Sequence, residues 1–563
     1  MMTLMPRLLK TILAAALAAA TLISGKSAAA QECAIASAHP LATRAGCQVL
    51  AQGGNAFDAA VSVTDALAVV EPFASGIGGG GFYLLHREAD RRQVFIDARE
   101  TAPARARAEF YTDAQGNPRE RLSLEGPTAA GIPGIPAAID WLSRRYGSLT
   151  LEQTLQPAIE LAREGFPADA RYVWATGFRT ELLNRHPPAA RIFLDDGKAV
   201  TAGYRVRQPA LAQTLGALAR DGRDGFYSGA VAREMVSAVQ AAGGLWTLDD
   251  LAGYSVIERE PHRFSFRGAR ITSAPLPSSG GLVMAQALQI LDQFSLDSLT
   301  EPERAHLVVE AMRRGYNDRA RYMGDPGFVE VPMSMLGSRD YARRRAASID
   351  PRQATPSSAL PSVAESRVES QQTTHFSIVD GFGNRVAATL SVNGPFGSGF
   401  VAGSTGVLLN NHMNDFSLAL AAPNLYKLVG NDANAIEPGK RPLSSMSPTF
   451  VEDSRGILVL GTPGGSRIIS MVMLGILDYL LEPAPDLERM VARPRYHHQY
   501  LPDRVEIEPG GFGESWVEAL QAKGHRVETG RRKWGNMQAV FVDKRSGARS
   551  AAGDPRGRAG VLF

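Results

Sequence analysis

A threonine-rich strand about two-thirds of the way along the chain carries the residues with the clearest chemistry. Residues 371–380 read QQTTHFSIVD. Alternation along a β-strand puts Thr373, His375 and Ser377 on one face and the residues between them on the other. If the chain is cut before Thr373, the new α-amine, which titrates near pH ~8, can accept the proton of the threonine's own hydroxyl. An N-terminal threonine is then both nucleophile and base, whereas without cleavage the same residues form an ordinary hairpin.

The second strand of that hairpin and five further motifs surround this segment. Residues 380–384 predict a turn, and the strand after it carries Ser391 and Asn393 at a spacing of two. The other motifs are GGGGF at 78–82, DARETAP at 97–103, LLNNHMNDF at 408–416, RPLSSMSPT at 441–449 and GTPGGSR at 461–467. In this order and at this spacing the chain resembles the γ-glutamyltransferase (γ-glutamyltranspeptidase) family of N-terminal-nucleophile hydrolases. The resemblance runs from about Cys33 to residues 554–556.

The resemblance implies an α+β fold in which two stacked antiparallel sheets lie between layers of helices, an αββα four-layer sandwich. It also implies one precursor that becomes two subunits, the large one over residues 31–372 and the small one over residues 373–563. The Thr373 hydroxyl would attack the carbonyl carbon of Gln372, and water would then cleave the resulting ester. Both subunits are expected to contribute strands to one core, so that they remain together as a heterodimer.

The same resemblance assigns the chemistry that follows maturation. Thr373 is expected to attack the γ-amide of a donor such as glutathione and to pass the γ-glutamyl group to water or to the amine of an amino acid or dipeptide. Gly464 and Gly465 match the segment that binds the negative oxygen of the intermediates, because glycine lets backbone N–H groups turn inward; taken alone they predict only a turn. Ser391 stands where many members have threonine, and its hydroxyl can still bond near the nucleophile's amine.

A γ-glutamyl donor also presents a carboxylate and an ammonium group far from the reacting carbonyl. Arg99 matches the family's carboxylate-binding arginine, whose planar guanidinium can hold both oxygens. Ser444 and Ser445 match its paired hydroxyls, while Asn393 and Asp415 match its ammonium-binding residues. Composition alone would make Arg99 a solvated surface charge and Asp415 a helix cap.

Two residues depart from the family pattern and bear on donor selection. His412 stands where Gln or Glu is commoner, and a protonated histidine there would repel the donor's ammonium group, so donor binding is expected to change with pH near ~6.5. Asn414 replaces a common Asp and removes another negative charge. Residues 421–434, including Tyr426, resemble the lid that covers the donor in many bacterial members, which favours γ-glutamyl selection.

These observations leave three interpretations of function. The first is a γ-glutamyltransferase with glutathione hydrolase activity. The second is a related acylase of different acyl specificity, such as a glutaryl or cephalosporin amide hydrolase, which residues 393–397 and His412 keep open. The third is a noncatalytic exported binding protein, which the intact Thr373, Arg99 and glycine pair argue against.

Composition and the first residues predict an exported protein. The chain has 563 residues, 44% of them apolar, and a formal net charge of +3, so no strong attraction to polyanions or membranes follows. Residues 1–30 combine a basic start, an apolar run and a small-residue cleavage site, which predicts a signal peptide and a periplasmic or secreted protein, with an uncleaved anchor as the alternative. An oxidising compartment permits a disulfide between Cys33 and Cys47, although two buried thiols fit as well. No cofactor, metal-site or nucleic-acid motif is expected.

The pattern of apolar residues predicts a mixture of strands and helices. Helices are expected over residues 40–50 and 56–70, the second capped by Asn55 and buried on all sides. Residues 130–330 are expected to be mainly helical, and strands dominate after Thr373. Residues 350–372 are rich in Ser, Ala, Pro and Gln and predict an exposed, flexible segment beside the cleavage junction.

Overall fold

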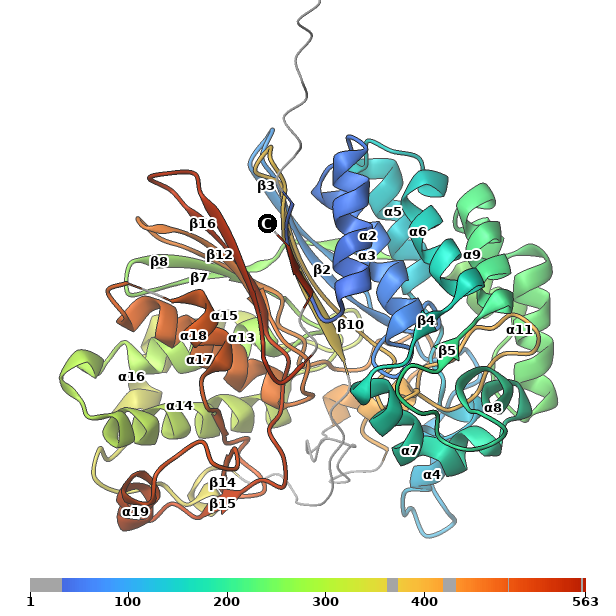
Figure 1. Ribbon diagram of the computed structural model, residues 1–563. Helices are drawn as coiled ribbons and strands as arrows, with labels where there is room; N and C mark the ends of the chain where they lie inside the picture. The colour runs from blue at the N-terminus through green and yellow to red at the C-terminus, as the bar shows by residue number, and fades with distance from the viewer. Residues whose placement is uncertain (1–32, 362–372, 419–431, 485, 558–559, 563) are drawn as a thin grey trace, which may run out of the picture.

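Two antiparallel sheets pack face to face between layers of helices in the computed structural model, which describes residues 33–361, 373–418, 432–484, 486–557 and 560–562 (Figure 1). The first sheet has the order β18 (Gly560–Leu562), β1 (Ala34–Ser37), β9 (Thr374–Val379), β10 (Arg385–Ser391), β2 (Gly80–Arg87), β3 (Arg92–Ala98) and β6 (Ile257–Arg259). The second has the order β17 (Arg549–Gly553), β16 (Gln538–Asp543), β12 (Gly456–Gly461), β11 (Thr449–Glu452), β8 (Ala269–Ser273) and β7 (His262–Phe266). The predicted α+β four-layer sandwich is therefore confirmed.

Helices cover the outer face of each sheet (Figure 1). The helices on the side of the first sheet are α2 (Pro40–Ala51), α3 (Ala56–Val70), α4 (Glu120–Leu124), α5 (Ile135–Tyr146), α6 (Leu151–Glu164), α7 (Ala170–Asn184), α8 (Pro187–Phe193), α9 (Pro209–Asp221), α10 (Asp224–Tyr227), α11 (Gly229–Ala241) and α12 (Leu248–Gly253). Those on the side of the second sheet are α13 (Gly280–Leu291), α14 (Glu301–Tyr322), α15 (Met333–Leu336), α16 (Arg339–Ala347), α17 (Arg467–Leu481), α18 (Leu487–Ala492) and α19 (Glu514–Ala522). Smaller sheets join β13 (Tyr496–His497) to β14 (Val505–Ile507) and β15 (Val527–Thr529), and β4 (Phe166–Pro167) to β5 (Arg205–Val206).

Strand β9, which begins one residue after Thr373, occupies a central position between β1 and β10. Its Phe376 and Ile378 belong to the apolar core that includes α3. Val379 belongs to a second apolar core, which includes residues of the second sheet and of the helices that cover it. His375 faces the second sheet, where it lies so close to Gly461 of β12 that a Cβ there would come within 2.2 Å of its ring. The alternation expected from the sequence is therefore confirmed, and it turns the polar face of β9 toward the second sheet.

Helix α3 forms the floor beneath this strand. Asn55 caps it in a capping box with Asp58, as its sequence predicts, and all of its residues from Ala56 to Val70 are buried. The two predicted N-terminal helices are thus confirmed within one residue at each end. A helix buried on all sides is stable here because the sheet and neighbouring helices cover every side of it.

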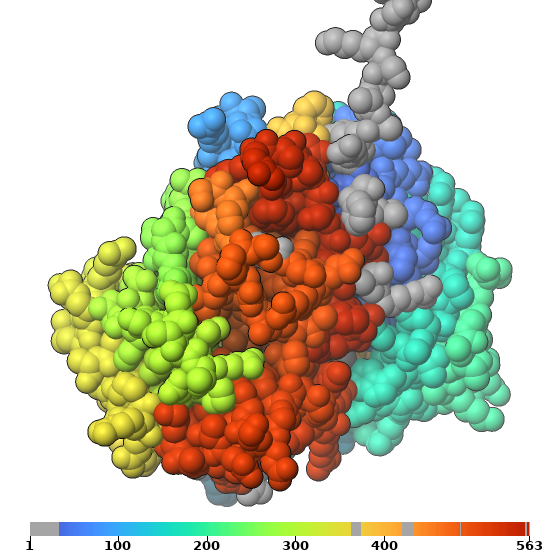
Figure 2. Space-filling view, turned by 60° about the vertical axis from the view of Figure 1, so that its left-hand side comes forward, coloured from blue at the N-terminus to red at the C-terminus, as the bar shows by residue number. Residues whose placement is uncertain are grey.

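The region over residues 130–330 holds more strand than its sequence suggested. It supplies β6, β7 and β8, and the last two form one edge of the second sheet. Their alternation is visible in His262–Phe266, where only every second residue is buried, but the strands are short and stand among longer helical patterns. Segments from both sides of residue 373 therefore build the second sheet. In Figure 2 the orange-to-red C-terminal third lies between the green and the blue-to-teal parts of the chain.

The segment before the expected cleavage junction is also more ordered than predicted, as far as residue 361. Within it, η4 (Ser357–Ala359) is a short 3-10 helix, and Ser357 is buried. Its backbone N–H donates to Asp503 and its hydroxyl donates to the carbonyl of Tyr500. The polar composition of this segment suggested that it is exposed. Its partners Tyr500 and Asp503 lie far away in the sequence, so the composition did not reveal that they anchor it.

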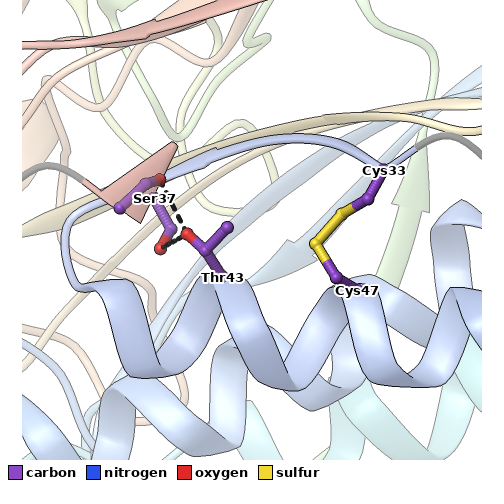
Figure 3. Close-up of a disulfide and its surroundings, with 5 residues drawn as sticks. Cys33, Ser37, Thr43 and Cys47 are labelled. Carbon is purple, nitrogen blue, oxygen red and sulfur yellow. Dashed lines mark hydrogen bonds between the residues drawn. A yellow bond between two sulfur atoms is a disulfide. The ribbon is translucent and has the colours of Figure 1, made fainter. Parts of the chain in front are cut away.

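A disulfide joins Cys33, just before β1, to Cys47 on α2, with the two Cα atoms 5.4 Å apart (Figure 3). Close by, the hydroxyls of Ser37 and Thr43 lie 2.7 Å apart, and Thr43 also donates to the carbonyl of Gly560 in β18. The edge of the first sheet is in this way fastened to α2 at two points. Among the described residues, no helix is long and apolar enough to cross a membrane.

Candidate active site

A cavity of about 340 Å³ opens at the start of β9. It is lined by Arg99, Arg319, Thr373, Ser391, Asn393, His412, Asp415, Leu443, Ser444, Ser445, Met446, Gly465 and Ile468. The structure therefore brings together every catalytic or substrate-binding residue predicted from the sequence except Gly464, which is the neighbour of a lining residue. Gln372 and residues 421–431 of the expected lid, with Tyr426, lie outside the described residues.

Thr373 is one of the residues that line this cavity. Its Oγ1 donates a hydrogen bond of 3.3 Å to Oγ of Ser391, the last residue of β10. The Ser391 Oγ in turn accepts from the backbone N–H of Asn393 at 2.7 Å. The next residue is held from the opposite side, because Thr374 Oγ1 donates to Oε2 of the buried Glu71 at 3.1 Å. The orientation of the start of β9 is thus fixed on both faces of the sheet.

Gly464 and Gly465 form the turn that leads into α17. Their φ angles are 143° and 59°, which L side chains rarely adopt. A Cβ on Gly464 would also come within 2.5 Å of Cε of Met471, one turn into α17. Gly465 lines the cavity together with Thr373. The turn can therefore present backbone N–H groups to an oxygen on the carbon that Thr373 attacks.

Arg99 is fully buried beside the cavity, where a cation requires partners. Its Nε and Nη2 donate to the carbonyls of Pro442 and Leu443 at 3.2 and 3.4 Å, and Nη2 also pairs with Oδ2 of Asp415. Oδ1 of Asp415 is buried with no hydrogen-bond partner among the described residues. A guanidinium and a carboxylate side by side can receive the two charged ends of an α-amino acid.

Glu100 is a site residue that the sequence analysis did not single out. It is fully buried, and its Oε1 lies 2.7 Å from Nδ1 of His412, while its Oε2 lies 3.5 Å from Nη1 of Arg99. Nε2 of His412 is 4.0 Å from Asp415. A carboxylate that the sequence analysis did not consider therefore lies against the ring of His412, and the expected change of donor binding with pH stays a prediction. The signal was available, since Glu100 follows Arg99 directly in the DARETAP motif.

Arg319 is the second residue that was missed. It lies on α14, is almost fully buried, and donates from Nε to Oγ of Ser279 at 2.8 Å and from Nη2 to Oγ of Ser445 at 3.4 Å. Burial lowers the pKa of Arg319 to about 10, although the nearby Tyr316 and Asp415 favour its charged form. Nothing in the sequence distinguishes it from the other arginines of this helix.

The remaining predicted residues differ in their surroundings. Ser444 accepts a hydrogen bond from the backbone of Met446 at 3.1 Å, and Asn393 donates to the carbonyl of Asn411 at 3.0 Å from a left-handed conformation with φ of 75°. Asn414 does not line the cavity; its amide donates to Ser123 at 2.9 Å. Because Asn414 does not line the cavity, the lack of an acid at this position does not change the charge of the cavity lining.

A separate cluster has the residue types of a metal site. His306, Glu310 and His525 hold their nitrogen and oxygen atoms within 4.8 Å of one another, among the described residues. However, Glu310 is engaged by Arg313 and Arg314 at 3.2 and 2.6 Å. Nδ1 of His306 faces Nε2 of His525 at 2.7 Å. A divalent cation would have to displace two guanidinium groups, so hydrogen bonds and ion pairs account for this cluster better than a metal does.

The fold and the cavity together define a class of enzyme. Two face-to-face antiparallel sheets lie between helices, and a threonine hydroxyl at the start of a central strand faces a glycine turn and a buried arginine–carboxylate pair. These are the features of an N-terminal-nucleophile hydrolase. The chain belongs to the gamma-glutamyltranspeptidase family, whose profile matches residues 42–563.

Individual relatives agree with this assignment. The glutathione hydrolase proenzyme of Escherichia coli (strain K12) is 42% identical, over 93% of this chain and 90% of that protein. The acylase ACY 1 proenzyme of Pseudomonas sp. (strain SE83) is 36% identical, over 89% of this chain and 88% of that protein. The crystal structure of cephalosporin acylase from Bacillus halodurans superposes with a TM-score of 0.82 at 28% identity, covering 94% of this chain and 95% of that one.

Proposed function

We propose that the protein is a γ-glutamyltransferase with glutathione hydrolase activity, produced as a precursor that cleaves itself. The observation that carries the proposal is the position of the Thr373 hydroxyl in one buried cavity with the Arg99–Asp415 pair. A nucleophile alone suits any acylase of this fold. A cation and an anion side by side suit an acyl group that ends in an α-amino acid, as a γ-glutamyl group does.

Maturation is the first reaction. The Thr373 oxygen attacks the carbonyl carbon of Gln372, its proton passes to the departing peptide nitrogen, and the amide becomes an ester. Water then hydrolyses that ester, which yields a large subunit over residues 31–372 and a small one that begins at Thr373. A signal peptide over residues 1–30 and a periplasmic or secreted location complete this proposal.

Turnover then uses the same oxygen. Thr373 Oγ1 attacks the γ-carbonyl of the donor, and its proton goes to the free α-amine, the base that cleavage creates. The N–H groups of the turn at Gly464 and Gly465 stabilise the oxyanion. Collapse expels the donor's amine, which leaves with a proton, and leaves a γ-glutamyl ester. Water or the amine of an amino acid or dipeptide then attacks this ester and regenerates the threonine.

Substrate selection follows from the charges around the cavity. Arg99, with the hydroxyls of Ser444 and Ser445, would hold the donor's α-carboxylate, and Asp415, with Asn393, would hold its ammonium group. Glu100 adds a carboxylate that balances His412. With His412 balanced by Glu100, Asp415 is the anion that faces the ammonium group, which favours a zwitterionic acyl group over a plain dicarboxylate such as glutaryl.

An acylase specific for another acyl group is the second candidate. It is favoured by the close superposition on a cephalosporin acylase and by the similarity to acylase ACY 1 proenzyme. Its substrate would lack the ammonium group, and Asp415 would then face the acyl chain without a cationic partner from the substrate.

One comparison separates the two candidates. Purified protein is assayed with γ-glutamyl-p-nitroanilide and with glutaryl-p-nitroanilide, which both end in a carboxylate and differ only in the α-amino group. The proposed function predicts a higher kcat/KM for the γ-glutamyl compound by at least about tenfold, the effect of one charge-assisted contact. A preference for the glutaryl compound would support the acylase.

A second experiment addresses the nucleophile. Mature protein should contain two chains, the smaller with the N-terminal sequence TTHFS, whereas Thr373→Ala should remain one chain. Thr374→Ala is the matched control, because it removes a neighbouring hydroxyl that bonds Glu71 and not the cavity. Normal cleavage of Thr373→Ala would disprove the assignment of the nucleophile.

A further inference from the structure

A second and larger cavity lies beside α17, away from the residues that line the active site. Its empty volume, which includes space open to solvent, is about 640 Å³, and it shares no lining residue with the first cavity. Its walls include three methionines and two aromatic residues, namely Met471, Met490, Met537, Tyr496 and Phe512. Methionine side chains adapt to ligands of different shape, so these walls suit a small apolar group.

The charged groups of this cavity leave one guanidinium without a counter-ion. Asp478 pairs with Arg493, which also lies 3.8 Å from Glu301, and Arg495 pairs with Asp554. Arg304, one turn into α14, has no ion pair with any described residue.

The hydrogen bonds of Arg304 are equally incomplete. Its Nη2 donates to the carbonyl of Leu299 at 3.3 Å, but its Nε is buried and has no hydrogen-bond partner in the described part of the chain. A guanidinium is always charged, and a buried donor without an acceptor is costly. Arg304 as a whole is partly exposed, and an anion in this cavity would supply both the missing acceptor for Nε and a counter-ion for the guanidinium.

The cavity is separated from the glycine turn by one side chain. Met471 lines the cavity, and its methyl group packs against Gly464, where a Cβ would come within 2.5 Å of it. On the other side of Met471, a Cβ on Gly535 would come within 2.6 Å of the methionine sulfur. Met471 is held between two glycines, so a group that displaces it from the cavity side will press on the turn.

We propose that this cavity is a regulatory binding site for a small organic acid that has an apolar body and one carboxylate. The carboxylate pairs with Arg304 at the mouth, and the apolar body packs among the methionines and reaches Met471. Contact with Met471 shifts the turn at Gly464, whose N–H groups stabilise the oxyanion in the proposed reaction. The acid therefore changes the rate of the chemical step without occupying the donor site.

Binding is tested first by titration calorimetry, which does not depend on γ-glutamyl activity. The probe is 4-phenylbutyrate, and 4-phenylbutanamide is its neutral control. We expect saturable binding of the acid by mature protein and binding of the amide at least about tenfold weaker, the usual effect of losing a charge-assisted contact. Equal affinity for the two compounds, or no saturable binding of the acid, would overturn the proposal.

Variants locate the bound acid. Arg304→Gln should weaken binding by about tenfold or more, whereas Arg489→Gln, an exposed arginine on α18 outside this cavity, should leave it unchanged. Leu474→Trp fills the cavity from α17 and should also abolish binding. Arg99→Lys should bind the acid normally. Loss of binding in Arg99→Lys with retention in Arg304→Gln would place the acid in the active site and refute the second site.

Kinetics test the coupling to the glycine turn. With a γ-glutamyl anilide as donor, saturating 4-phenylbutyrate should change kcat with the half-saturation found by calorimetry, and the KM of the donor should stay constant. Arg304→Gln should lose this response and keep its basal rate. A rise in KM alone indicates competition at the donor site, and binding without any change in kcat contradicts the regulatory role. Absence of γ-glutamyl activity would instead contradict the proposed function and leave the calorimetric result standing.

Discussion

Glu100 lies against His412, a residue that lines the active-site cavity, with Oε1 of Glu100 2.7 Å from Nδ1 of His412. The other oxygen of the same carboxylate lies 3.5 Å from Arg99. One buried acid therefore touches both the residue expected to hold the donor's carboxylate and the residue expected to repel its ammonium group. Any positive charge on the imidazole is opposed at contact distance, so the effect of His412 on donor binding depends on Glu100.

The first prediction concerns this pair. Glu100→Gln removes a buried anion and should raise the KM of a γ-glutamyl donor by tenfold to a hundredfold, about 1.5–3 kcal/mol for a contact with a charged group. His412→Gln should change KM much less, and its KM should follow that of wild type across the usual titration range of histidine, about pH 5 to 8. Steady-state kinetics of both variants and the double variant measure the coupling. If the KM of His412→Gln is tenfold below that of wild type near pH 5, His412 acts as a cation that Glu100 does not oppose.

The second prediction concerns Arg99. Lysine keeps the charge but loses the planar fork, and with it the bonds to the carbonyls of Pro442 and Leu443 that position Ser444 and Ser445. Arg99→Lys should raise the donor's KM by about tenfold to a hundredfold, while cleavage before Thr373 continues. Arg107→Lys is the control, because in the described part of the chain the Arg107 guanidinium bonds only nearby backbone carbonyls. Unchanged KM in Arg99→Lys would remove this arginine from the donor site.

The third prediction concerns the glycine turn. Gly464→Ala places a methyl group 2.5 Å from Cε of Met471 at a φ of 143°, so the turn must move. Loss of one oxyanion donor lowers kcat by about 10²–10³, and KM should change little because the donor's charged end binds elsewhere. Gly510→Ala is a control at positive φ with no atom within 4 Å of the new methyl group. A normal kcat for Gly464→Ala would show that the turn does not bind the oxyanion.

Local signals predicted the nucleophile strand and α3 well, because the alternation of β9 and the capping box at Asn55 are fixed by adjacent residues. The motifs likewise located Thr373 and Arg99. The sequence did not reveal Arg319, since its role comes from contact with Ser279 and Ser445, which are distant along the chain. The sequence did not reveal the partner of His412 for the same reason, because Glu100 follows the end of β3, more than 300 positions earlier.

The fourth prediction concerns acid stability and the segment that leads to the cleavage junction. Glu310 on α14 is fully buried and accepts hydrogen bonds from Arg314 at 2.6 Å and from the backbone of Thr355 at 3.1 Å. Burial favours the neutral acid, but the charges of Arg313 and Arg314 outweigh it and lower the pKa of Glu310 to about 2, from an ordinary value of 4.5. Because the folded protein holds the ionised form, this stabilisation is complete above about pH 4.5 and is lost as the pH falls toward 2.

The expected loss follows from the size of that shift. A pKa of Glu310 that is two to three units lower in the folded than in the unfolded protein corresponds to ~3 kcal/mol in the free energy of unfolding. Glu310→Gln leaves two buried guanidinium groups without their anion and should destabilise the protein by ~3–5 kcal/mol near neutral pH. Its deficit relative to wild type should shrink as the pH falls toward 2. Glu301→Gln, a 65% exposed acid on the same helix, should stay within ~1 kcal/mol of wild type throughout. Urea unfolding at several pH values measures these differences, and a deficit of Glu310→Gln that stays constant with pH would show that Glu310 is not ionised in the folded protein.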